Sequence, residues 1–136
     1  MIGIFQKTGT NDLGFALSTL SEKNRQITRN IANADTPFYR AKKLVFGEVM
    51  EEYYDSMKGG KKLYVTNERH IQPFQTPPNP NDFVRRQNNP STRNDGNDVN
   101  LDYEMTEMDA SAMLYDMFAQ ISGGKFATLK EIIKTR

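Results

Sequence analysis

Apolar residues recur with helical spacing at both ends of the chain, and that spacing disappears between them. Towards the N-terminus the intervals alternate between four and three residues, as in the seam of a coiled coil. The members of this seam are Leu13, Leu17, Leu20, Asn24, Ile27, Ile31 and Ala34. Asn11 is the expected N-cap, and Thr36-Pro37 should end the helix because the residue before a proline avoids the α conformation. We therefore predict a helix within residues 1–36.

The C-terminal region carries the same alternation up to the end of the chain. Its seam consists of Leu101, Met105, Met108, Ala112, Tyr115, Ala119, Ser122, Phe126, Leu129 and Ile133. A second apolar row, formed by Ala110, Leu114, Met117 and Ile121, falls on nearly the opposite face of the same helix. A helix with two apolar faces needs burial on two sides, which one partner helix cannot supply. Residues 100–136, with Asn100 as N-cap, are therefore predicted to form a helix that packs against several neighbours.

The middle of the chain, residues 37–99, has no helical period of comparable length. All six prolines lie there, and proline interrupts a long helix because it lacks a backbone donor. Phe46 to Met57 has the pattern of a short amphipathic helix ended by Gly59-Gly60, and Leu63 to Thr66 has the composition of a strand. The expected fold is mainly α. Its long terminal helices pack antiparallel in a coiled-coil-like manner, and its irregular Pro/Asn-rich middle holds a short helix and has room for a short strand pair.

Composition bounds the size of the core and the kinds of partner that the chain can have. Hydrophobic residues make up 37% of the chain and the mean hydropathy is −0.71, so a monomeric core would be thin and a partner could complete the burial. The 18 lysines and arginines face 17 aspartates and glutamates, which is not the basic surplus of a nucleic-acid-binding protein. No apolar run approaches the ~20 residues of a membrane span, and the N-terminus lacks the pattern of a cleavable signal peptide. We therefore expect no nucleic-acid partner and no direct membrane insertion.

Patterns that would indicate catalysis or metal binding are weak. The chain has one histidine, His70, and no cysteine, which leaves no histidine cluster, catalytic triad or thiolate site within one subunit. Asp98-x-Asn100-x-Asp102 imitates a calcium-binding loop, but Tyr103 and Asp109 occupy the positions of the required glycine and glutamate. We predict the start of a helix there, and no catalytic residue, metal or cofactor. The weaker alternative is an enzyme with a pocket in the middle region, which a stabilising ligand would reveal.

Four short segments resemble one family of proteins. The run from Asn30 to Tyr39 is similar to the signature Asn-hydrophobic-Ala-Asn-x-x-Thr-Pro-Gly-Tyr of flagellar rod and hook proteins; the matching residues are Asn30, Ala32, Asn33, Thr36, Pro37 and Tyr39. The segments Asp95 to Met105, Ile121 to Lys130 and Thr66-Asn67-x-x-His70 resemble the same family. Phe38 stands where the signature has glycine, which puts the local turn in question because glycine reaches positive φ more readily than phenylalanine.

The resemblance implies a structural subunit of the proximal rod of the flagellar basal body. Such subunits are exported to the periplasm without cleavage of a signal peptide, polymerise through their terminal helices, transmit torque and form the wall of the export channel. The implied partners are copies of the chain itself, other rod proteins, the adaptor FliE, and components of the membrane ring and export gate. Residues 1–36 and 100–136 would then be assembly helices, with the two seams and the second apolar row as the assembly interface.

Some alternatives stay open at the level of sequence. A cytoplasmic coiled-coil adaptor would use the same seams, but it would need the dense charged pairs beside them that this chain lacks. Asn24 is the one strongly polar member of the N-terminal seam, and it either sets the register of packing from a buried position or lies at the surface. Gly123-Gly124 predicts either a close approach to another backbone or a break in the C-terminal helix before Phe126.

Overall fold

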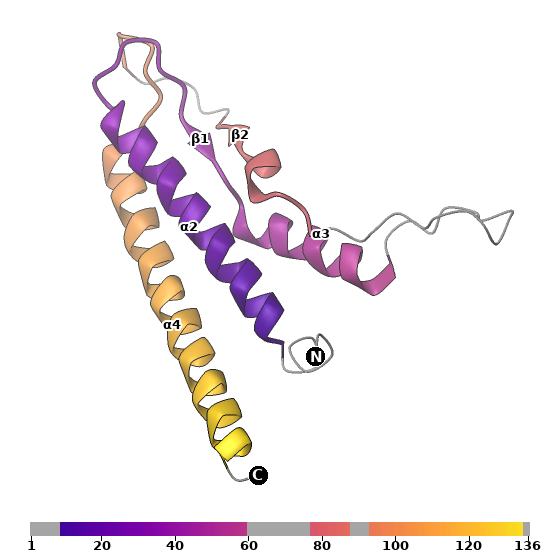
Figure 1. The fold of residues 1–136 in the computed structure, drawn as a ribbon. Coiled ribbons are helices and arrows are strands. Elements are labelled where there is room, and N and C mark those ends of the chain that lie inside the picture. Colours follow the sequence, from indigo (N-terminus) through magenta and orange to yellow (C-terminus); the bar gives the residue numbers. More distant parts are fainter. Residues whose placement is uncertain (1–8, 60–76, 88–92, 135–136) are drawn as a thin grey trace, which may run out of the picture.

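The computed structural model describes residues 9–59, 77–87 and 93–134, and it is mainly helical (Figure 1). Two long helices dominate it: α2 (Thr10–Ala32) and α4 (Leu101–Lys134). Between them in the chain lie strand β1 (Lys42–Lys43), helix α3 (Phe46–Gly59), the 3-10 turn η1 (Pro80–Phe83) and strand β2 (Arg85–Arg86). The predicted fold class is confirmed.

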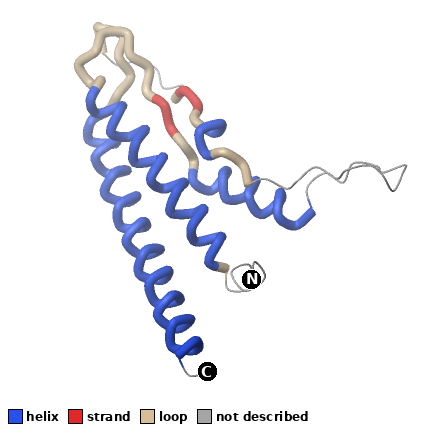
Figure 2. The backbone as a smooth tube through the Cα atoms, viewed as in Figure 1, coloured by secondary structure: helices blue, strands red, loops and turns tan. Residues whose placement is uncertain are grey.

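α2 and α4 run antiparallel and side by side (Figures 1 and 2). The end of α2 meets the start of α4, where Nδ2 of Asn30 donates a hydrogen bond to Oε1 of Glu104 at 3.0 Å. Lys23 and Glu107 form an ion pair between the same helices at 2.8 Å. At the other end, Gly9 lies beside Nζ of Lys125. The last turns of α4 therefore continue past the described start of α2.

The core is small and centred on α2. Its buried apolar side chains are Ala16, Leu20, Ile27, Ala41, Leu44, Val49, Tyr53 and Val99. Within the predicted N-terminal seam, Leu20 and Ile27 are buried, and Leu13, Leu17, Asn24, Ile31 and Ala34 are half-buried. α2 also buries Thr19, Gln26 and Asn30, which are polar. The seam therefore gives only part of the buried surface of this helix.

α3 packs against the first half of α2 on the side away from α4 (Figure 1). The rings of Phe15 and Tyr53 stack with their centroids 4.2 Å apart. The Tyr53 hydroxyl donates a hydrogen bond to Oδ1 of Asp12 at 2.8 Å, and burial together with this carboxylate raises the pKa of Tyr53 to about 12. The start of α3 also reaches α4, because the ring centroids of Phe46 and Phe118 are 6.1 Å apart. These contacts hold α3 on the helical pair.

Helix boundaries agree with the sequence in part. Asn11 is not the N-cap of α2; the cap is Gly9, whose φ of 65° lets the chain enter the helix without a side-chain cap. α2 ends at Ala32, before the proline that was expected to stop it. Asn100 does cap α4, since its Oδ1 accepts a hydrogen bond from the backbone N of Tyr103 at 3.2 Å.

Expectations for the interior of the chain have different outcomes. α4 passes through Gly123-Gly124 as one continuous helix, which excludes the alternative of a break there and leaves the close approach to another backbone as a prediction. The short helix before Gly59 is confirmed as α3. The strand expected at Leu63 to Thr66 lies outside the described residues, and so does His70. None of the helices described is long and apolar enough to span a bilayer.

Candidate assembly surface

Asn30, the first residue of the family-like signature, is buried at the end of α2 and joins three elements. Its Nδ2 donates to the carbonyl oxygen of Lys42 at 2.7 Å and to Oε1 of Glu104 at 3.0 Å. Its Oδ1 accepts from the backbone N of Lys42 at 3.1 Å and from the hydroxyl of Tyr39 at 3.3 Å. Because both ends of the carboxamide are used, Asn30 ties α2 to β1 and to α4.

Asn97 closes the turn that follows α2, and it is fully buried. Its Nδ2 donates at 2.9–3.0 Å to three carbonyl oxygens, those of Asn33, Ala34 and Thr36. Its Oδ1 accepts from the backbone N of Val99 at 2.7 Å. Carbonyls at the end of a helix have no partner within the helix. Asn97 therefore completes the end of α2 from a segment 61–64 positions further along the chain.

Asp98 fixes the strand that leaves this turn. Its side chain is fully buried, and Oδ1 accepts a hydrogen bond from the backbone N of Ala41 at 2.6 Å. Nη1 of Arg40 lies 3.4 Å from Oδ2. Asn33 holds the turn from within, because its Nδ2 donates to the carbonyl of Arg29 at 2.7 Å. We call this network the polar knot; its members are Asn30, Asn33, Tyr39, Asn97, Asp98 and Glu104.

Glu104 is the acidic member of the polar knot that lies between α2 and α4. Burial raises the pKa of Glu104, and the nearby charges of Glu107 and Asp98 raise it further. The hydrogen bond from Asn30 acts in the opposite direction, because it favours the ionised form. Burial also raises the pKa of Tyr39, with a contribution from the charge of Glu104.

Phe38 adopts a conformation that suits the glycine of the signature. Its φ is 60°, and it is the one non-glycine residue with positive φ in the described part of the chain. The ring is 81% exposed and lies against Gly96, where an added Cβ would come within 2.9 Å of Cδ1 of Phe38. The backbone N of Phe38 donates to the carbonyl of Asp95 at 3.0 Å. The doubt about this turn is resolved: the chain keeps the glycine-like angle despite the bulky side chain.

The remaining signature residues have smaller roles in the knot. Thr36 contributes its carbonyl to Asn97, and its Oγ1 donates to Oδ1 of Asn33 at 3.3 Å. Ala32 and Pro37 are exposed. Sequence reasoning missed that the segments 30–39 and 95–105 bind each other. Their shared richness in asparagine and aspartate was the available signal, because these side chains satisfy irregular backbone.

α4 turns a polar side towards α2. Its buried residues are Glu104 and Ser111, and neither belongs to the predicted seam. Most of that seam is exposed, namely Leu101, Met105, Ala112, Tyr115, Phe126 and Ile133, whereas Met108, Ala119, Ser122 and Leu129 are half-buried. The second row is exposed throughout, at Ala110, Leu114, Met117 and Ile121. The fully buried residues of α4 thus lie outside the seam, and they are polar, so a search for apolar periodicity passes over them. The role of the seam in assembly stays a prediction.

Two buried polar atoms of the helical pair have no hydrogen-bond partner. They are Oδ1 of Asn24 and Oγ of Ser111. In the antiparallel register that pairs Asn30 with Glu104, Asn24 of α2 falls near Ser111 of α4. Oδ1 of Asn24 is thus buried, although the residue as a whole is half-buried, and its role in setting the register of packing stays a prediction.

The described residues contain no group of three or more His, Cys, Asp or Glu side chains that could hold a metal ion. A pocket of about 230 Å³ lies between β1, α2 and α4. Its lining includes Leu44, Val45 and Phe46 as well as Lys42 and Lys43.

Comparison with known proteins identifies the family. No protein-family model matches the chain. The flagellar basal body rod protein FlgB of Bacillus subtilis is 33% identical over 118 residues, which cover 87% of each chain. The chain belongs to the FlgB family. FlgB of Escherichia coli is 28% identical over 125 residues, 88% of each chain, and FlgB of Borrelia hermsii is 27% identical over 126 residues, 87% of this chain and 90% of its own.

In this member of the FlgB family, the signature residues and the exposed apolar residues of α4 have different places in the structure. Half of the signature residues, namely Asn30, Asn33 and Tyr39, belong to the polar knot, which joins the ends of α2 and α4 within one subunit. Many large apolar side chains of α4 are exposed instead, among them Leu114, Met117 and Ile121. The candidate assembly surface of this FlgB-family chain is therefore the outside of α4, and the knot is what holds α4 in position.

Proposed function

We propose that this chain is a structural subunit of the flagellar basal-body rod and that it assembles through the exposed apolar rows of α4. The supporting observation is the exposure of Leu114, Met117 and Ile121 along one side of a rigid helix, in a member of the FlgB family. Contiguous exposed apolar surface on a soluble domain marks a protein–protein contact. The seam and the second row lie on different sides of α4, so one subunit can bind more than one neighbour.

The finer parts of the proposal follow from a tubular assembly. Helices that pack laterally around a channel would form its wall and transmit torque along the rod. The partners in this proposal are copies of the chain, other rod proteins, the adaptor FliE, and components of the membrane ring and export gate. The subunit would reach the periplasm without a cleaved signal peptide, and it would act without a catalytic step.

A cysteine-protection experiment tests the proposal. The chain has no cysteine of its own, so Met117→Cys provides a single thiol on the second row. We expect the purified subunit to react readily with a biotin maleimide and the same variant within isolated hook–basal bodies to be protected. Glu52→Cys, on the exposed side of α3, is the matched control and should react in both states.

Two outcomes would contradict the proposal in different ways. Absence of the chain from purified hook–basal bodies would reject the rod function itself. Equal labelling of Met117→Cys in the free and assembled states would reject the second row as an assembly surface, while leaving the rod function in place.

A further inference from the structure

The two short strands place like charges opposite each other. Lys42 pairs with Arg86, and Lys43 with Arg85, and all four side chains are exposed. Like charges directly opposite each other on paired strands are destabilising. Among the described residues, only Arg85 of these four forms an ion pair, with Glu48 at 3.9 Å. We call the four residues the basic ribbon. Such a ribbon is stabilised when an anionic surface binds it.

A surface of the opposite charge lies on α4. From Leu101 to Gly124 this helix contains acidic residues and no lysine or arginine. Glu104 and Glu107 already bind α2, through Asn30 and Lys23 respectively. The negative charge that is left for another partner comes from the three aspartates of this stretch.

Asp102, Asp109 and Asp116 stand seven positions apart, and therefore share one face of α4. Each precedes by two positions a residue that faces the inside of the subunit, which places it about 160° around the helix from that residue. All three are exposed, and none forms an ion pair with a described residue. We call this row, roughly 21 Å long, the acidic stripe.

Met113 lies within the acidic stripe. It is 74% exposed, and it stands four positions after Asp109 and three before Asp116. Residues three and four apart on a helix are surface neighbours, so the thioether lies between the two carboxylates. A large apolar side chain in the middle of a charged row has no packing role within the described part of the subunit.

The pocket beside the basic ribbon is suited to such a side chain. Its volume of about 230 Å³ exceeds that of one side chain, and Leu44, Val45 and Phe46 give it an apolar lining. Lys42 and Lys43 line the same pocket, and so do Lys23, Glu104 and Glu107, so charged groups of both signs and apolar surface occur together there. Glu104 and Glu107 already bind Asn30 and Lys23, which leaves Lys42 and Lys43 for another partner. Methionine is unbranched and polarisable, which lets it fill irregular spaces.

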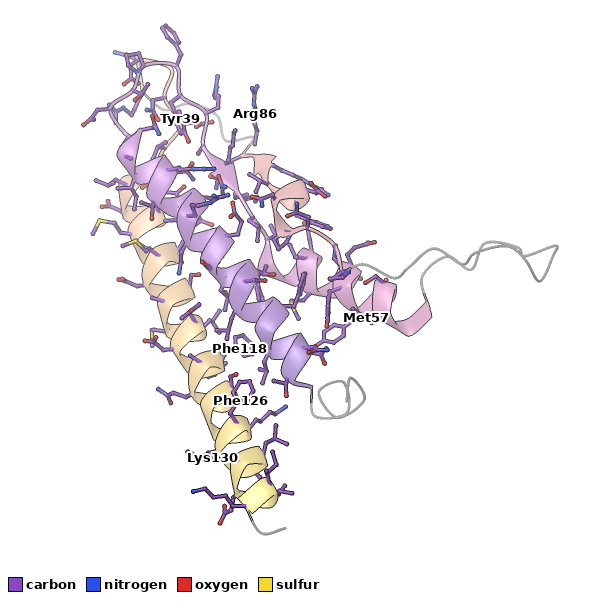
Figure 3. All side chains as sticks on the ribbon, in the orientation of Figure 1. Tyr39, Met57, Arg86, Phe118, Phe126 and Lys130 are labelled. Atoms are coloured by element: carbon purple, nitrogen blue, oxygen red, sulfur yellow. The ribbon has the colours of Figure 1, made fainter. Side chains whose placement is uncertain are left out.

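The basic ribbon and the acidic stripe cannot meet within one chain. The ribbon lies beside the inward side of α4, where Glu104 and Glu107 line the same pocket as Lys42 and Lys43. The stripe lies about 160° around α4 from the buried residues Glu104 and Ser111, and so on the opposite side of that helix. Figure 3 shows the side chain of Arg86 directed away from the helices. Complementary surfaces on different sides of a subunit produce a head-to-tail contact, which builds rings or helical filaments.

We propose that the basic ribbon of one copy of the chain binds the acidic stripe of a neighbouring copy, and that Met113 enters the pocket beside the ribbon. The inference rests on the proposed function, since the rod is the assembly that brings copies together. It adds a charged contact to the apolar rows and fixes the order in which two copies associate, because complementary charge determines orientation and register more than affinity.

Paired charge reversals test this contact in the bacterium that encodes the chain. Lys42→Glu combined with Arg86→Glu reverses one cross-strand pair of the ribbon, and Asp109→Lys combined with Asp116→Lys reverses two of the three aspartates of the stripe. We expect each pair of changes alone to lower the yield of hook–basal bodies about tenfold, because repulsion replaces attraction at two sites. All four changes together should restore most of the yield, since the reversed cross-strand pair then faces the reversed stripe positions with opposite charge.

The controls use charged residues elsewhere on the same elements. Lys130→Glu on α4 and Glu52→Lys on α3 are exposed reversals outside both surfaces and should leave the yield unchanged. Met113→Asp should lower the yield, and Met113→Leu should preserve it. Circular dichroism of each purified variant separates a lost contact from a lost fold.

Three results decide the matter. Normal yield in both reversed pairs overturns the contact. Loss that the fourfold variant does not restore also overturns it, and assigns the ribbon to another anionic surface, such as lipid headgroups. Absence of the wild-type chain from hook–basal bodies would reject the proposed function, and is distinguishable because it needs no variant.

Discussion

Phe38 holds a backbone angle that its own side chain disfavours. A non-glycine residue in the left-handed region costs roughly 1–2 kcal/mol, and a ring that is 81% exposed recovers little of this by burial. The angle persists because the surrounding turn is fixed by Asn97 and by the hydrogen bond from the backbone N of Phe38 to Asp95. The turn dictates the angle here, and the residue adapts to it.

We expect Phe38→Gly to raise the free energy of unfolding by about 0.5–1 kcal/mol, which is the strain relieved less the added entropy of an unfolded glycine. Urea denaturation of the purified chain measures it. Phe38→Ala keeps the Cβ and removes the ring, so it should show no such gain. A loss of stability in both variants would mean that the ring contact with Gly96 outweighs the strain.

Glu104 gives the subunit a pH dependence of predictable sign. Its folded pKa is raised by burial and by the charges of Glu107 and Asp98. Protonation therefore favours the folded state. This contribution to stability is fully present below the unfolded pKa, about 4.3 for a glutamate, and is lost as the pH rises through the higher folded value.

Glu104→Gln should accordingly raise the free energy of unfolding at pH 7, on the order of 1 kcal/mol for each unit of raised pKa. The amide oxygen of glutamine can still accept the hydrogen bond from Asn30. The gain should shrink at pH 4, where the wild-type carboxyl is protonated. Thermal unfolding at the two pH values tests this, with Glu52→Gln on the exposed side of α3 as control. A destabilised Glu104→Gln at pH 7 would refute it.

At the scale of the elements, α4 is a single helix that passes through two adjacent glycines. A Cβ added at Gly123 or Gly124 would meet no atom within 4 Å. Each glycine nevertheless weakens the helix by roughly 1 kcal/mol relative to alanine. Nothing within the described part of the subunit requires the absence of side chains at these two positions.

Gly124→Ala therefore separates a requirement of the subunit from a requirement of the rod. We expect the free energy of unfolding of the purified variant to be about 1 kcal/mol higher than that of the wild type. We also expect fewer complete hook–basal bodies, because the added methyl group would occupy the space that a neighbour's backbone approaches. Unfolding followed by circular dichroism and basal-body yield are the two measurements. Higher stability with an unchanged yield would show that the glycines are incidental to assembly.

The elements also show what apolar periodicity can and cannot reveal. It located α2 and α4 because long helices repeat their pattern many times. On α4 it found the rows that lie outside the subunit and overlooked the inward side, since Glu104 and Ser111 are polar. It gave no sign of the pairing between β1 and β2, because strands of two residues are too short to show an alternation of apolar and polar positions.

At the scale of the whole molecule, the arrangement of the ends was predictable and the connection between them was not. Asn30 and Asn97 were visible as family-like residues, but their hydrogen bonds run between segments far apart in sequence. Such pairing depends on how three stretches of chain meet, which no local pattern encodes. For the same reason the basic ribbon becomes visible only when Lys42 and Arg86 are placed side by side.

Asn97→Ala should lower the free energy of unfolding of the whole subunit by about 1–3 kcal/mol, the cost of one buried unsatisfied group. The backbone N of Val99 would lose the hydrogen bond to Oδ1 of Asn97, whereas the carbonyls of Asn33, Ala34 and Thr36 each keep a second donor. Denaturant unfolding measures the loss. Asn94→Ala, at an exposed position of the same segment, is the matched control and should change little. A near-neutral Asn97→Ala would show that water replaces the side chain.

The long reach of Asn97 also sets the order of events while the chain is made. Ribosomes produce residues 10–32 well before Asn97 exists, and an isolated helix of that length is only marginally stable in water. We therefore expect the nascent N-terminal half to lack stable structure until the segment 61–64 positions downstream has been synthesised. Closing that long loop is slow compared with forming local structure. A ribosome-stalled fragment that ends at residue 96 should thus be readily cleaved by protease, whereas the released full chain resists cleavage within α2.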